Sequence, residues 1–476
     1  MEKKNKWVKT KIVATIGPAS DNDHTLTRMI KHGMSVARLN FSHGLHEDHL
    51  KVIEMIRRIS NEERIPVSIL QDLCGPKIRL GLLPEPVKLK KNQVIKLAIG
   101  KNNEAELYTD FKELTEVVKK DDPILIDDGN IELTALEIKK DYILCKVKVP
   151  GIAKSKKGIN LPDCTVPIPV FTEKDSEDLE FGLQNGVDMV AMSFVDSPSN
   201  IIPVKKLMKK YNREIPVIAK IERPVALTRI EEILDAFDGI MIARGDLGVE
   251  VHPEEVPIIQ KRLIHLANLK NKMVITATQM LESMVNNPRP TRAEASDVSN
   301  AILDGTDAVM LSAETAAGNY PLESVCMMRR IALTTEESEL YPHSIEYDKK
   351  KIDPTEAIVR GAARIAHDLD AACIIVFSYT GNTALKLSKY RPVCPVFGIS
   401  SQEDAVTRMA GYWGICPHLI EPAESVEEMI HRGDEILASK KLVKPGGLVI
   451  TISGAAPVKG ATNVLKISKF GEATLV

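Results

Sequence analysis

The sequence lacks the features of a secreted or membrane-spanning protein. No apolar stretch among its 476 residues approaches the roughly 18–20 residues that a helix needs to cross a bilayer. The first residues, Met-Glu-Lys-Lys-Asn-Lys-Trp, do not form a signal peptide. Its seven cysteines are scattered, without a Cys-x-x-Cys pair, so we expect reduced thiols and no disulfide framework. These absences predict a soluble protein of the cytoplasm.

The chain also lacks a strong excess of positive or of negative charge. The chain has 63 Lys and Arg against 65 Asp and Glu, a formal net charge of −2. This balance argues against a nucleic acid or a membrane surface as a partner. A hydrophobic content of 44% and a charged content of 27% are those of an ordinary globular protein. The length fits two or three domains.

Apolar strands alternate with amphipathic helices in two parts of the chain that flank an interruption. Eight such strand–helix pairs predict a (β/α)8 barrel, a TIM barrel. The predicted strands are residues 11–16, 35–42, 67–72, 188–195, 216–222, 239–246, 272–279 and 307–314. The predicted helices are residues 25–32, 47–60, 175–184, 199–211, 227–237, 254–269, 292–303 and 321–335.

Two further units complete the expected α/β architecture. The interruption contains short β-rich runs at residues 87–99, 123–126, 130–138 and 142–149, which predict an inserted all-β lid, although a purely decorative insertion stays open. Beyond about residue 344, strands at 371–377, 393–399, 414–419 and 447–453 alternate with helices at 355–368, 384–389, 403–412 and 425–440. That pattern predicts a doubly wound α/β domain.

Charged and polar residues gather where the predicted barrel strands end. Lys220 and Glu222 share one side of their strand, and Asp246 ends the next. Alone, this would fit a structural ion pair, but barrel enzymes build their sites at the carboxyl ends of the strands, which favours an enzyme. The other residues at these ends are Arg38, Asn40, Ser42, Asp72, Ser193, Thr276, Thr278, Ser312 and Glu314.

This cluster suits phosphoryl transfer. Glu222 and Asp246 offer hard oxygen ligands for Mg²⁺. Lys220, Arg38 and Arg79 supply positive charge, and no Ser/His or Cys/His pair is apparent as a nucleophile. A G-x-x-x-x-G-K-[ST] loop is absent, which excludes a P-loop enzyme. The residues alone predict a metal-dependent barrel enzyme for a phosphorylated or carboxylated small molecule.

The first strand–helix turn of the C-terminal unit is rich in small hydroxyl residues. It reads Ser-Tyr-Thr-Gly-Asn-Thr over residues 378–383, at the start of a helix. Free backbone N–H groups and the helix dipole there suit a phosphate. A simple capped turn explains the same residues, and both readings stay open.

Several long motifs resemble the pyruvate kinase family. They run in the family's order along essentially the whole chain: KIVATIGPAS at residues 11–20, ARLNFSHG at 37–44, IAKIE at 218–222, MIARGDLG at 241–248 and ATQMLESM at 277–284. The resemblance implies an enzyme of glycolysis that transfers the phosphoryl group of phosphoenolpyruvate to ADP, giving pyruvate and ATP.

The resemblance also implies roles for individual residues. Lys220 would neutralise the phosphoryl group in flight, and Glu222 and Asp246 would hold Mg²⁺ or Mn²⁺. Further implied roles are catalysis for Arg38 and Thr278; binding of the substrate by Arg38, Lys220, Gly245, Asp246 and Thr278; contacts to the nucleotide for Asn40, His43, Arg79 and Lys174; a proton relay through Ser312 and Glu314; and an effector phosphate site at Ser378, Thr380, Gly381, Asn382 and Thr383.

The family likewise implies the domain plan and the partners. The barrel would comprise residues 1–74 and 170–340, the lid residues 75–169, and the C-terminal regulatory domain residues 344–476. We expect a homotetramer that responds to a sugar phosphate or a nucleotide.

Departures from the family pattern affect ion use and regulation. Potassium-dependent members carry a carboxylate where this chain has Lys77, so we expect no K⁺ requirement, with Lys77 as the cation beside a potential monovalent site of Asn40, Ser42 and Asp72. The loop at residues 454–462 lacks the tryptophan and arginine of members activated by fructose 1,6-bisphosphate. The family's Ser-Gly-Glu-Thr is Ser-Ala-Glu-Thr at residues 312–315, a change without an expected effect.

Two alternative functions stay open. One is a catalytically inactive regulator that binds metabolites. The other is another Mg²⁺-dependent barrel enzyme of phosphoenolpyruvate or pyruvate, such as an aldol-type lyase. The intact charged cluster argues against the first, and the lid and the third domain argue against the second.

Overall fold

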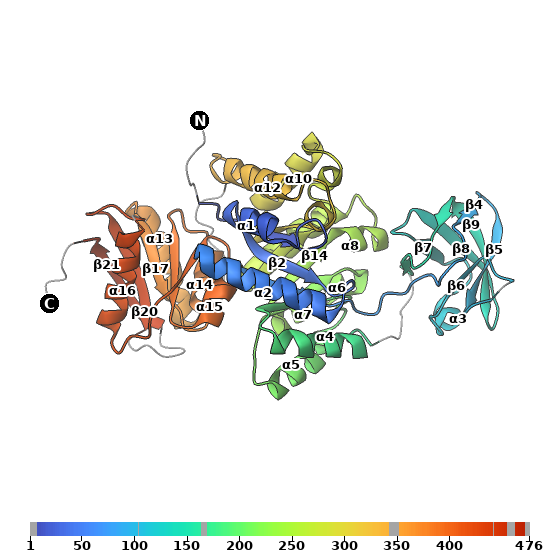
Figure 1. Ribbon diagram of the computed structural model, residues 1–476, viewed down its shortest axis with the longest axis horizontal. Helices are drawn as coiled ribbons and strands as arrows, with labels where there is room; N and C mark the ends of the chain where they lie inside the picture. Colours follow the sequence, from blue (N-terminus) through green and yellow to red (C-terminus); the bar gives the residue numbers. More distant parts are fainter. Residues whose placement is uncertain are drawn as a thin grey trace.

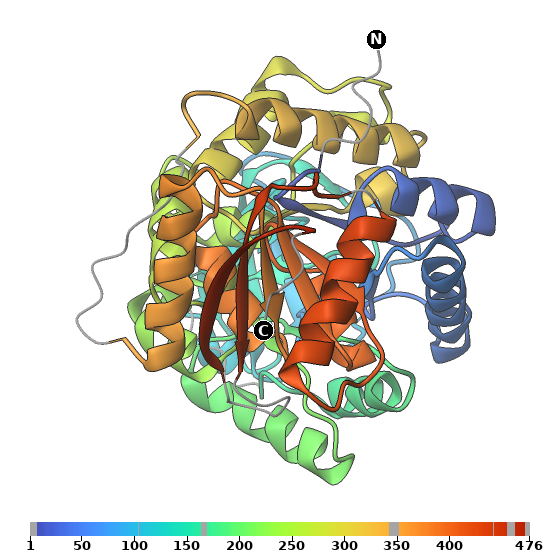
Figure 2. The same cartoon turned by 90° about the vertical axis from the view of Figure 1, so that its left-hand side faces the viewer.

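Three bodies follow one another along the long axis of the molecule (Figure 1). The computed structural model describes residues 7–102, 104–162, 169–341, 352–440, 442–454 and 462–471. A β-rich unit lies at one end, a barrel in the middle and a C-terminal α/β unit at the other end. Figure 2, turned by 90°, places the C-terminal sheet in front of the barrel. The two smaller bodies therefore cover opposite ends of the barrel.

Eight parallel strands close the central barrel in the order β1-β2-β3-β12-β13-β14-β15-β16, which confirms the predicted fold. All are largely buried, as expected for strands between a packed interior and a ring of helices. Their bounds are β1 Lys11–Thr15, β2 Met34–Asn40, β3 Ser68–Asp72, β12 Met189–Met192, β13 Val217–Ile221, β14 Gly239–Ala243, β15 Met273–Ala277 and β16 Ala308–Leu311.

Helices surround the barrel strands. They are α1 Asp23–Lys31, α2 His46–Glu63, α4 Glu173–Gln184, α5 Ile201–Lys210 after the 3-10 turn η1 Pro198–Asn200, α6 Pro224–Thr228, α7 Ile230–Ala236, α9 Val256–Leu269, α10 Arg292–Leu303 after η2 Glu282–Val285, and α12 Pro321–Glu336. The prediction of a single helix over residues 227–237 is wrong, because two helices, α6 and α7, cover this segment. The backbone of Arg229, at φ −116° and ψ 17°, leaves the helical region and divides α6 from α7.

Every barrel strand except β3 ends one to three residues before its predicted end, and two of these ends pass into short helices. The strands expected over residues 239–246 and 307–314 end with their apolar runs, at Ala243 and Leu311. The polar residues that follow fold into short helices, α8 Arg244–Glu250 and α11 Ala313–Ala316. The last residues of both predicted strands thus lie on helices that begin at the barrel mouth.

The inserted unit has a hydrophobic core of its own. Its six-stranded sheet has the order β11-β7-β8-β9-β5-β6, and β10 pairs with β4 beside it. The run predicted over residues 87–99 is two strands, because a turn at Asn92, with φ +65°, interrupts it. The elements are β4 Val87–Leu89, β5 Val94–Ile99, β6 Leu107–Thr109, α3 Leu114–Val117, β7 Pro123–Ile126, β8 Ile131–Ile138, β9 Tyr142–Val149, β10 Gly151–Ala153 and β11 Ile159–Asn160.

The C-terminal unit is a five-stranded sheet of order β19-β18-β17-β20-β21, in which β21 runs antiparallel and was not predicted. Its helices lie on both faces of the sheet (Figure 2). The elements are α13 Pro354–Asp368, β17 Cys373–Phe377, α14 Asn382–Lys389, β18 Val396–Ser400, α15 Glu403–Met409, β19 Ile415–Leu419, α16 Val426–Ser439, β20 Leu448–Gly454 and β21 Thr462–Lys469. The loop at residues 454–462, expected to lack an effector contact, lies outside the described residues except for its two ends.

The C-terminal unit packs on the floor of the barrel, where the strands begin. The buried side chains of Lys389 and Arg391 both pair with Asp307, which precedes β16. At the start of β1, Lys11 donates a hydrogen bond to the carbonyl of Ile415, at 2.7 Å. The carboxyl ends of the barrel strands therefore face the inserted unit, which leaves the barrel directly after β3.

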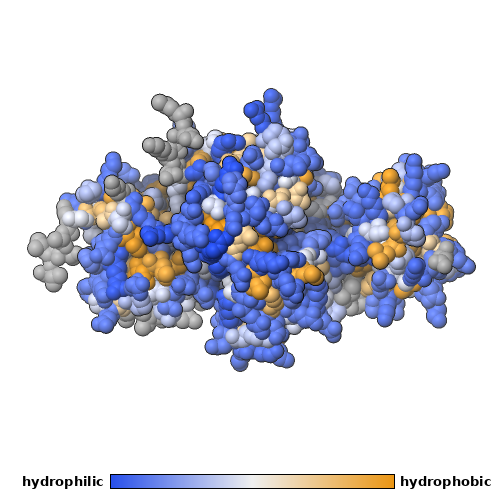
Figure 3. All heavy atoms as spheres, viewed as in Figure 1, coloured by the Kyte–Doolittle hydropathy of each residue, from blue (hydrophilic) through white to orange (hydrophobic). Residues whose placement is uncertain are grey.

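The surface is mostly hydrophilic on the face shown in Figure 3, where apolar residues form separate patches. No helix in the described part of the chain is long and apolar enough to cross a membrane.

Candidate active site

Lys220 stands at the centre of the barrel mouth, near the end of β13. Its Nζ lies 3.1 Å from Oδ1 of Asp72 and 2.9 Å from Oε1 of Glu222. It also donates a hydrogen bond to the Ser193 hydroxyl, at 2.7 Å. Alternation along β13 places Lys220 above Ile218, which fills the barrel interior. Three neighbouring strands thus bring their terminal polar residues to one ammonium group.

Charge holds this lysine protonated. Burial alone would lower the pKa of Lys220, but Asp72 and Glu222 outweigh burial and raise that pKa above its usual value. For Asp72, burial is likewise overcome by Lys220 and Arg38, which lower the pKa of its carboxyl group. Lys220 is therefore a fixed cation at neutral pH and cannot act as a base.

Arg38 completes a row of charges. It lies on β2, and its Nε donates to Oδ2 of Asp72 at 2.7 Å, while a terminal nitrogen donates to the Thr15 hydroxyl at 2.9 Å. Asp72 thus orients two cations at once, one through each oxygen. Its side chain is 1% exposed, so the arrangement is shielded from bulk water.

Glu222 and Asp246 are the two carboxylates predicted to hold a divalent cation. The Glu222 side chain is 2% exposed, and its Oε2 accepts a hydrogen bond from the backbone N–H of Phe194 at 2.7 Å. Burial raises the pKa of Glu222, Asp246 raises it further, and Lys220 opposes both. Asp246, predicted at a strand end, lies on α8 instead. Two carboxylates that disfavour each other's charge form a donor set that suits Mg²⁺, a hard cation.

The remaining ligands of such a cation would be water and substrate. Among the described residues, no group of three or more His, Cys, Asp and Glu side chains could hold a metal. Mg²⁺ typically keeps several waters and takes only one or two protein carboxylates, so two ligands are sufficient.

The ends of β15 and β16 bring further predicted residues to the mouth. The Thr278 hydroxyl accepts a hydrogen bond from the backbone N–H of Gly245 at 2.7 Å. Glu314, which is fully buried on α11, accepts from the backbone N–H of Ser312 at 2.6 Å and from that of Leu281 at 3.1 Å. The Ser312 hydroxyl is buried and has no hydrogen-bond partner among the described residues, as expected of a group that awaits water or substrate.

The residues predicted to contact the nucleotide each bond to nearby protein groups, and none of the contacts below joins one of them to another. Asn40 accepts from the backbone N–H of Ser42 at 3.2 Å, and the carbonyl of His43 lies 2.9 Å from Nε2 of His49. Arg79 donates to the carbonyl of Lys156 at 3.1 Å, within the inserted unit. Lys174, on α4, donates to the carbonyl of Phe41 at 2.9 Å.

Lys77 reaches Asp246, one of the two predicted metal ligands. Its Nζ lies 3.4 Å from Oδ1 of Asp246, and both side chains are 26% exposed. We expected this ammonium to lie beside Asn40, Ser42 and Asp72. The described residues instead pair it with Asp246. Lys77 lies on the segment between β3 and β4 that leads into the inserted unit, so this segment brings a positive charge to the barrel mouth.

Phe194 contributes to the site but was missed in the sequence, and Arg244 was noted at a strand end without a role. Phe194 adopts a left-handed backbone, φ +56°, which aims its N–H at Glu222. An apolar residue that acts through its backbone leaves no sequence signal. Arg244 did offer one, because its charge directly follows the apolar run of β14.

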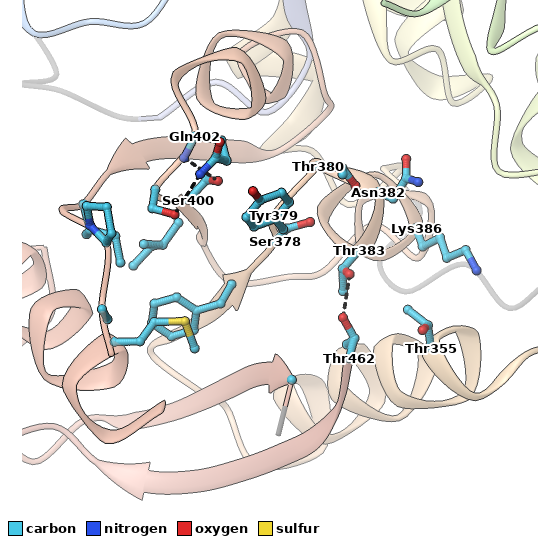
Figure 4. Close-up of a pocket in the computed structure, with 18 residues that line it drawn as sticks. Thr355, Ser378, Tyr379, Thr380, Asn382, Thr383, Lys386, Ser400, Gln402 and Thr462 are labelled. Carbon is cyan, nitrogen blue, oxygen red and sulfur yellow. Dashed lines mark hydrogen bonds between the residues drawn. The ribbon is translucent and has the colours of Figure 1, made fainter. Parts of the chain in front are cut away.

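The predicted effector turn borders a cavity of about 490 Å³ in the C-terminal unit (Figure 4). Ser378, Tyr379, Thr380, Asn382 and Thr383 line it, while Gly381 adopts φ +86° at the turn and is not a lining residue. Lys386 is the one charged residue among its described lining residues, and Lys386 pairs with Asp353. The Thr383 hydroxyl lies 2.9 Å from that of Thr462.

The fold and the mouth of the barrel together define a class, the barrel enzymes that carry out phosphoryl transfer with cationic side chains and a divalent-metal donor set. Family models agree with this class. The model "Pyruvate kinase, barrel domain" matches residues 7–325, and the model "Pyruvate kinase, alpha/beta domain" matches residues 356–468.

Known proteins narrow the class to one family. The chain is 43% identical to a pyruvate kinase of Sporosarcina psychrophila over 98% of this chain and 81% of that protein. It is 39% identical to that of Clostridium acetobutylicum, over 96% of this chain and 99% of the other. A crystal structure of a pyruvate kinase from Cryptosporidium parvum matches with a TM-score of 0.90 and 35% identity, covering 97% and 96% of the two chains. The chain belongs to the pyruvate kinase family, and the prediction of a pyruvate kinase is confirmed.

Proposed function

We propose that this chain transfers the phosphoryl group of phosphoenolpyruvate to ADP at the mouth of its barrel, giving pyruvate and ATP in glycolysis. The observation that carries the proposal is the position of the Lys220 Nζ at the barrel mouth, between the carboxylates of Asp72 and Glu222. Phosphoryl transfer is catalysed mainly by positioning and charge neutralisation, and a fixed ammonium supplies both.

The substrate lies between Lys220, Arg38 and α8. The ammonium of Lys220 faces the phosphoryl oxygens as charge spreads over them, and Arg38 binds the phosphate. The backbone N–H groups of Gly245 and Asp246, with the Thr278 hydroxyl, bind the carboxylate, which takes the place of the hydrogen bond between Gly245 and Thr278. A divalent cation, Mg²⁺ or Mn²⁺, held by Glu222 and Asp246 would supply further positive charge to the substrate oxygens.

After transfer, the enolate takes up a proton. Thr278, Ser312 and Glu314 border the path of that proton, and the buried Ser312 hydroxyl, without a described partner, supports a water at this point. Asn40, His43, Arg79 and Lys174 bind the nucleotide on the other side of the phosphoryl group. Arg79 belongs to the inserted unit, so closure of that unit as a lid would bring it to the nucleotide.

Lys77 replaces a monovalent cation. Its ammonium already lies beside Asp246, so a K⁺ ion at the potential site of Asn40, Ser42 and Asp72 would add a second positive charge to the same region. We therefore assign no K⁺ requirement to this enzyme.

The cavity beside α14 binds a phosphorylated effector. Hydroxyl and amide side chains line it, which suits a sugar phosphate or a nucleotide, and Lys386 would exchange its ion pair with Asp353 for the phosphate. Binding there would shift the affinity of the barrel for phosphoenolpyruvate, with Ser378, Thr380, Gly381, Asn382 and Thr383 as the phosphate turn.

The domain plan and the assembly follow the family. Residues 1–74 and 170–340 form the catalytic barrel, residues 75–169 the lid and residues 344–476 the regulatory domain. The enzyme acts as a homotetramer in the cytoplasm, and sedimentation of the purified chain measures the assembly.

A coupled assay for pyruvate tests the proposed function. We expect pyruvate to form from phosphoenolpyruvate only when ADP and a divalent cation are both present. Pyruvate formed without ADP would indicate a lyase or phosphatase instead, and binding of metabolites without turnover would indicate an inactive regulator.

A further inference from the structure

The turn that follows β15 has an unfavourable backbone. Thr278 and Gln279 both adopt positive φ, +68° and +53°. A threonine branches at Cβ and rarely takes this conformation unless surrounding contacts hold it. The turn carries the Thr278 hydroxyl to 2.7 Å from the backbone nitrogen of Gly245. The position of this hydroxyl therefore depends on whatever holds the turn.

The Thr278 hydroxyl donates to the carbonyl of Ala277 at 2.6 Å, and Arg244 holds the turn from the other side. Its guanidinium donates to the carbonyl of Thr278 at 2.7 Å and to that of Ala277 at 3.3 Å. These two carbonyls flank the Cα of Thr278, so fixing both fixes the direction of its side chain. A planar fork of donors reaches two neighbouring acceptors in a way that a single ammonium cannot.

The other side of the guanidinium is anchored to two outer helices. A terminal nitrogen lies 2.7 Å from Oδ1 of Asp297 on α10 and 3.3 Å from Oε1 of Gln260 on α9. The side chain of Arg244 is 10% exposed. Asp297 thus balances the charge of Arg244 and holds it in place.

Arg244 is also the first residue of α8, directly before Gly245 and Asp246. One residue therefore joins the two halves of the carboxylate site, the N–H groups of α8 and the hydroxyl of the turn. A small change in its side chain would move these halves relative to each other.

We propose that Arg244 is a positioning residue for the reaction, which acts through Thr278 by holding its strained turn against the start of α8. The inference rests on the proposed function, because Thr278 serves there in substrate binding and in protonation of the enolate. Arg244 itself does not touch the substrate.

A structural role alone would give the same contacts, and Arg57 offers a matched control for it. The Arg57 guanidinium also donates to two carbonyls, those of Val67 at 2.9 Å and Gly186 at 2.7 Å, and to Asp188 at 2.7 Å. These residues lie at the amino ends of β3 and β12, on the floor of the barrel. Arg57→Lys therefore disturbs an equivalent network far from the mouth.

A double-mutant cycle tests the inference. Arg244→Lys, Thr278→Ala and the combined variant are compared with wild type for kcat and for KM of phosphoenolpyruvate, with thermal unfolding of each as a measure of folding. We expect Arg244→Lys to lower kcat about 100-fold, the effect of a misplaced reacting geometry. Since both residues act through one hydroxyl, the double variant should fall within about twofold of the worse single variant. Arg57→Lys should lower the unfolding temperature and leave kcat unchanged.

Two outcomes would overturn the inference. One is losses in kcat that multiply in the double variant, and the other is an Arg244→Lys enzyme that loses stability and keeps its kcat, as Arg57→Lys should. Should Arg244→Lys not fold, Asp297→Asn takes its place in the cycle, because it weakens only the outer anchor. A wild-type chain without pyruvate kinase activity would instead overturn the proposed function, which the coupled assay decides before any variant is made.

Discussion

Replacing Lys77 by glutamate should create a K⁺ requirement, whereas the wild-type enzyme should need no K⁺. At 3.4 Å from Asp246, the ammonium attracts the carboxylate by about 1 kcal/mol at the dielectric constant of water and about 5 kcal/mol at an effective value of 20. Because both side chains are a quarter exposed, the lower part of this range applies. A carboxylate at residue 77 turns the attraction into repulsion beside the divalent-cation site.

The loss is large enough to measure. If about 2 kcal/mol of favourable charge disappears from the transition state, turnover without K⁺ falls about 30-fold. The assay compares rates in tetramethylammonium chloride with rates after addition of KCl. Wild type should be fully active without K⁺. Lys77→Glu should recover only partly on its addition, because Leu73 and Cys74 stand where the motif of potassium-dependent members, Asp-Thr-Lys-Gly-Pro-Glu, has Thr and Lys.

Lys77→Gln serves as the control, since it removes the ammonium without adding a carboxylate. It should lose less activity than Lys77→Glu. A wild-type enzyme that is nearly inactive until K⁺ is added would refute the reasoning, because the ammonium would then not replace the ion.

Four further variants probe the candidate metal site, the backbone at Gly75 after β3 and the effector cavity. Glu222→Gln and Asp246→Asn should each weaken apparent Mg²⁺ affinity at least about tenfold, with partial rescue at high metal; an unchanged titration in both would remove them from the metal site. Gly75→Ala should lower stability by at least about 1 kcal/mol, because φ is +65° and a Cβ would lie 2.9 Å from the Phe194 ring; thermal unfolding equal to wild type would contradict this. Sugar phosphates and AMP should activate wild type about 5–150-fold in apparent affinity for phosphoenolpyruvate and leave Thr380→Glu unaffected; equal responses would reduce the turn to a helix cap.

The sequence predicts the barrel well because its strands are buried on both faces. Each strand appears as a continuous apolar run with polar residues where it ends, and the period of two along β13 places Lys220 and Glu222 on one side. The same reasoning fails where an apolar run passes into a helix. Asp246 and Glu314 were predicted on strands, because a short helix such as α8 or α11 has too few residues for a periodic pattern.

The sequence also failed to predict strands that are very short or half-exposed. The strand β11 consists of Ile159 and Asn160, and β21 is an edge strand whose side chains are mostly exposed or half-buried. Neither has the apolar alternation on which a strand prediction depends.

Contacts between segments that are distant in the sequence limit how much of the site can be predicted. The partner of Lys77 is 169 positions away in the chain, so nothing in the local sequence shows that the ammonium meets Asp246. The Phe194 N–H that holds Glu222 depends on a positive φ, which an aromatic residue adopts only under tertiary constraint. Residue types at strand ends reveal which groups can act, and the folded chain decides which of them meet.

The central claim is that the Lys220 ammonium carries the phosphoryl transfer, and one measurement tests it most directly. Turnover of Lys220→Ala is compared with wild type at saturating phosphoenolpyruvate, ADP and Mg²⁺, on enzyme whose folding is confirmed by circular dichroism. Loss of a charge that acts on the transition state should lower kcat by about 100- to 1,000-fold or more and change KM for phosphoenolpyruvate little. A folded Lys220→Ala enzyme that keeps more than about a tenth of wild-type turnover would contradict the account.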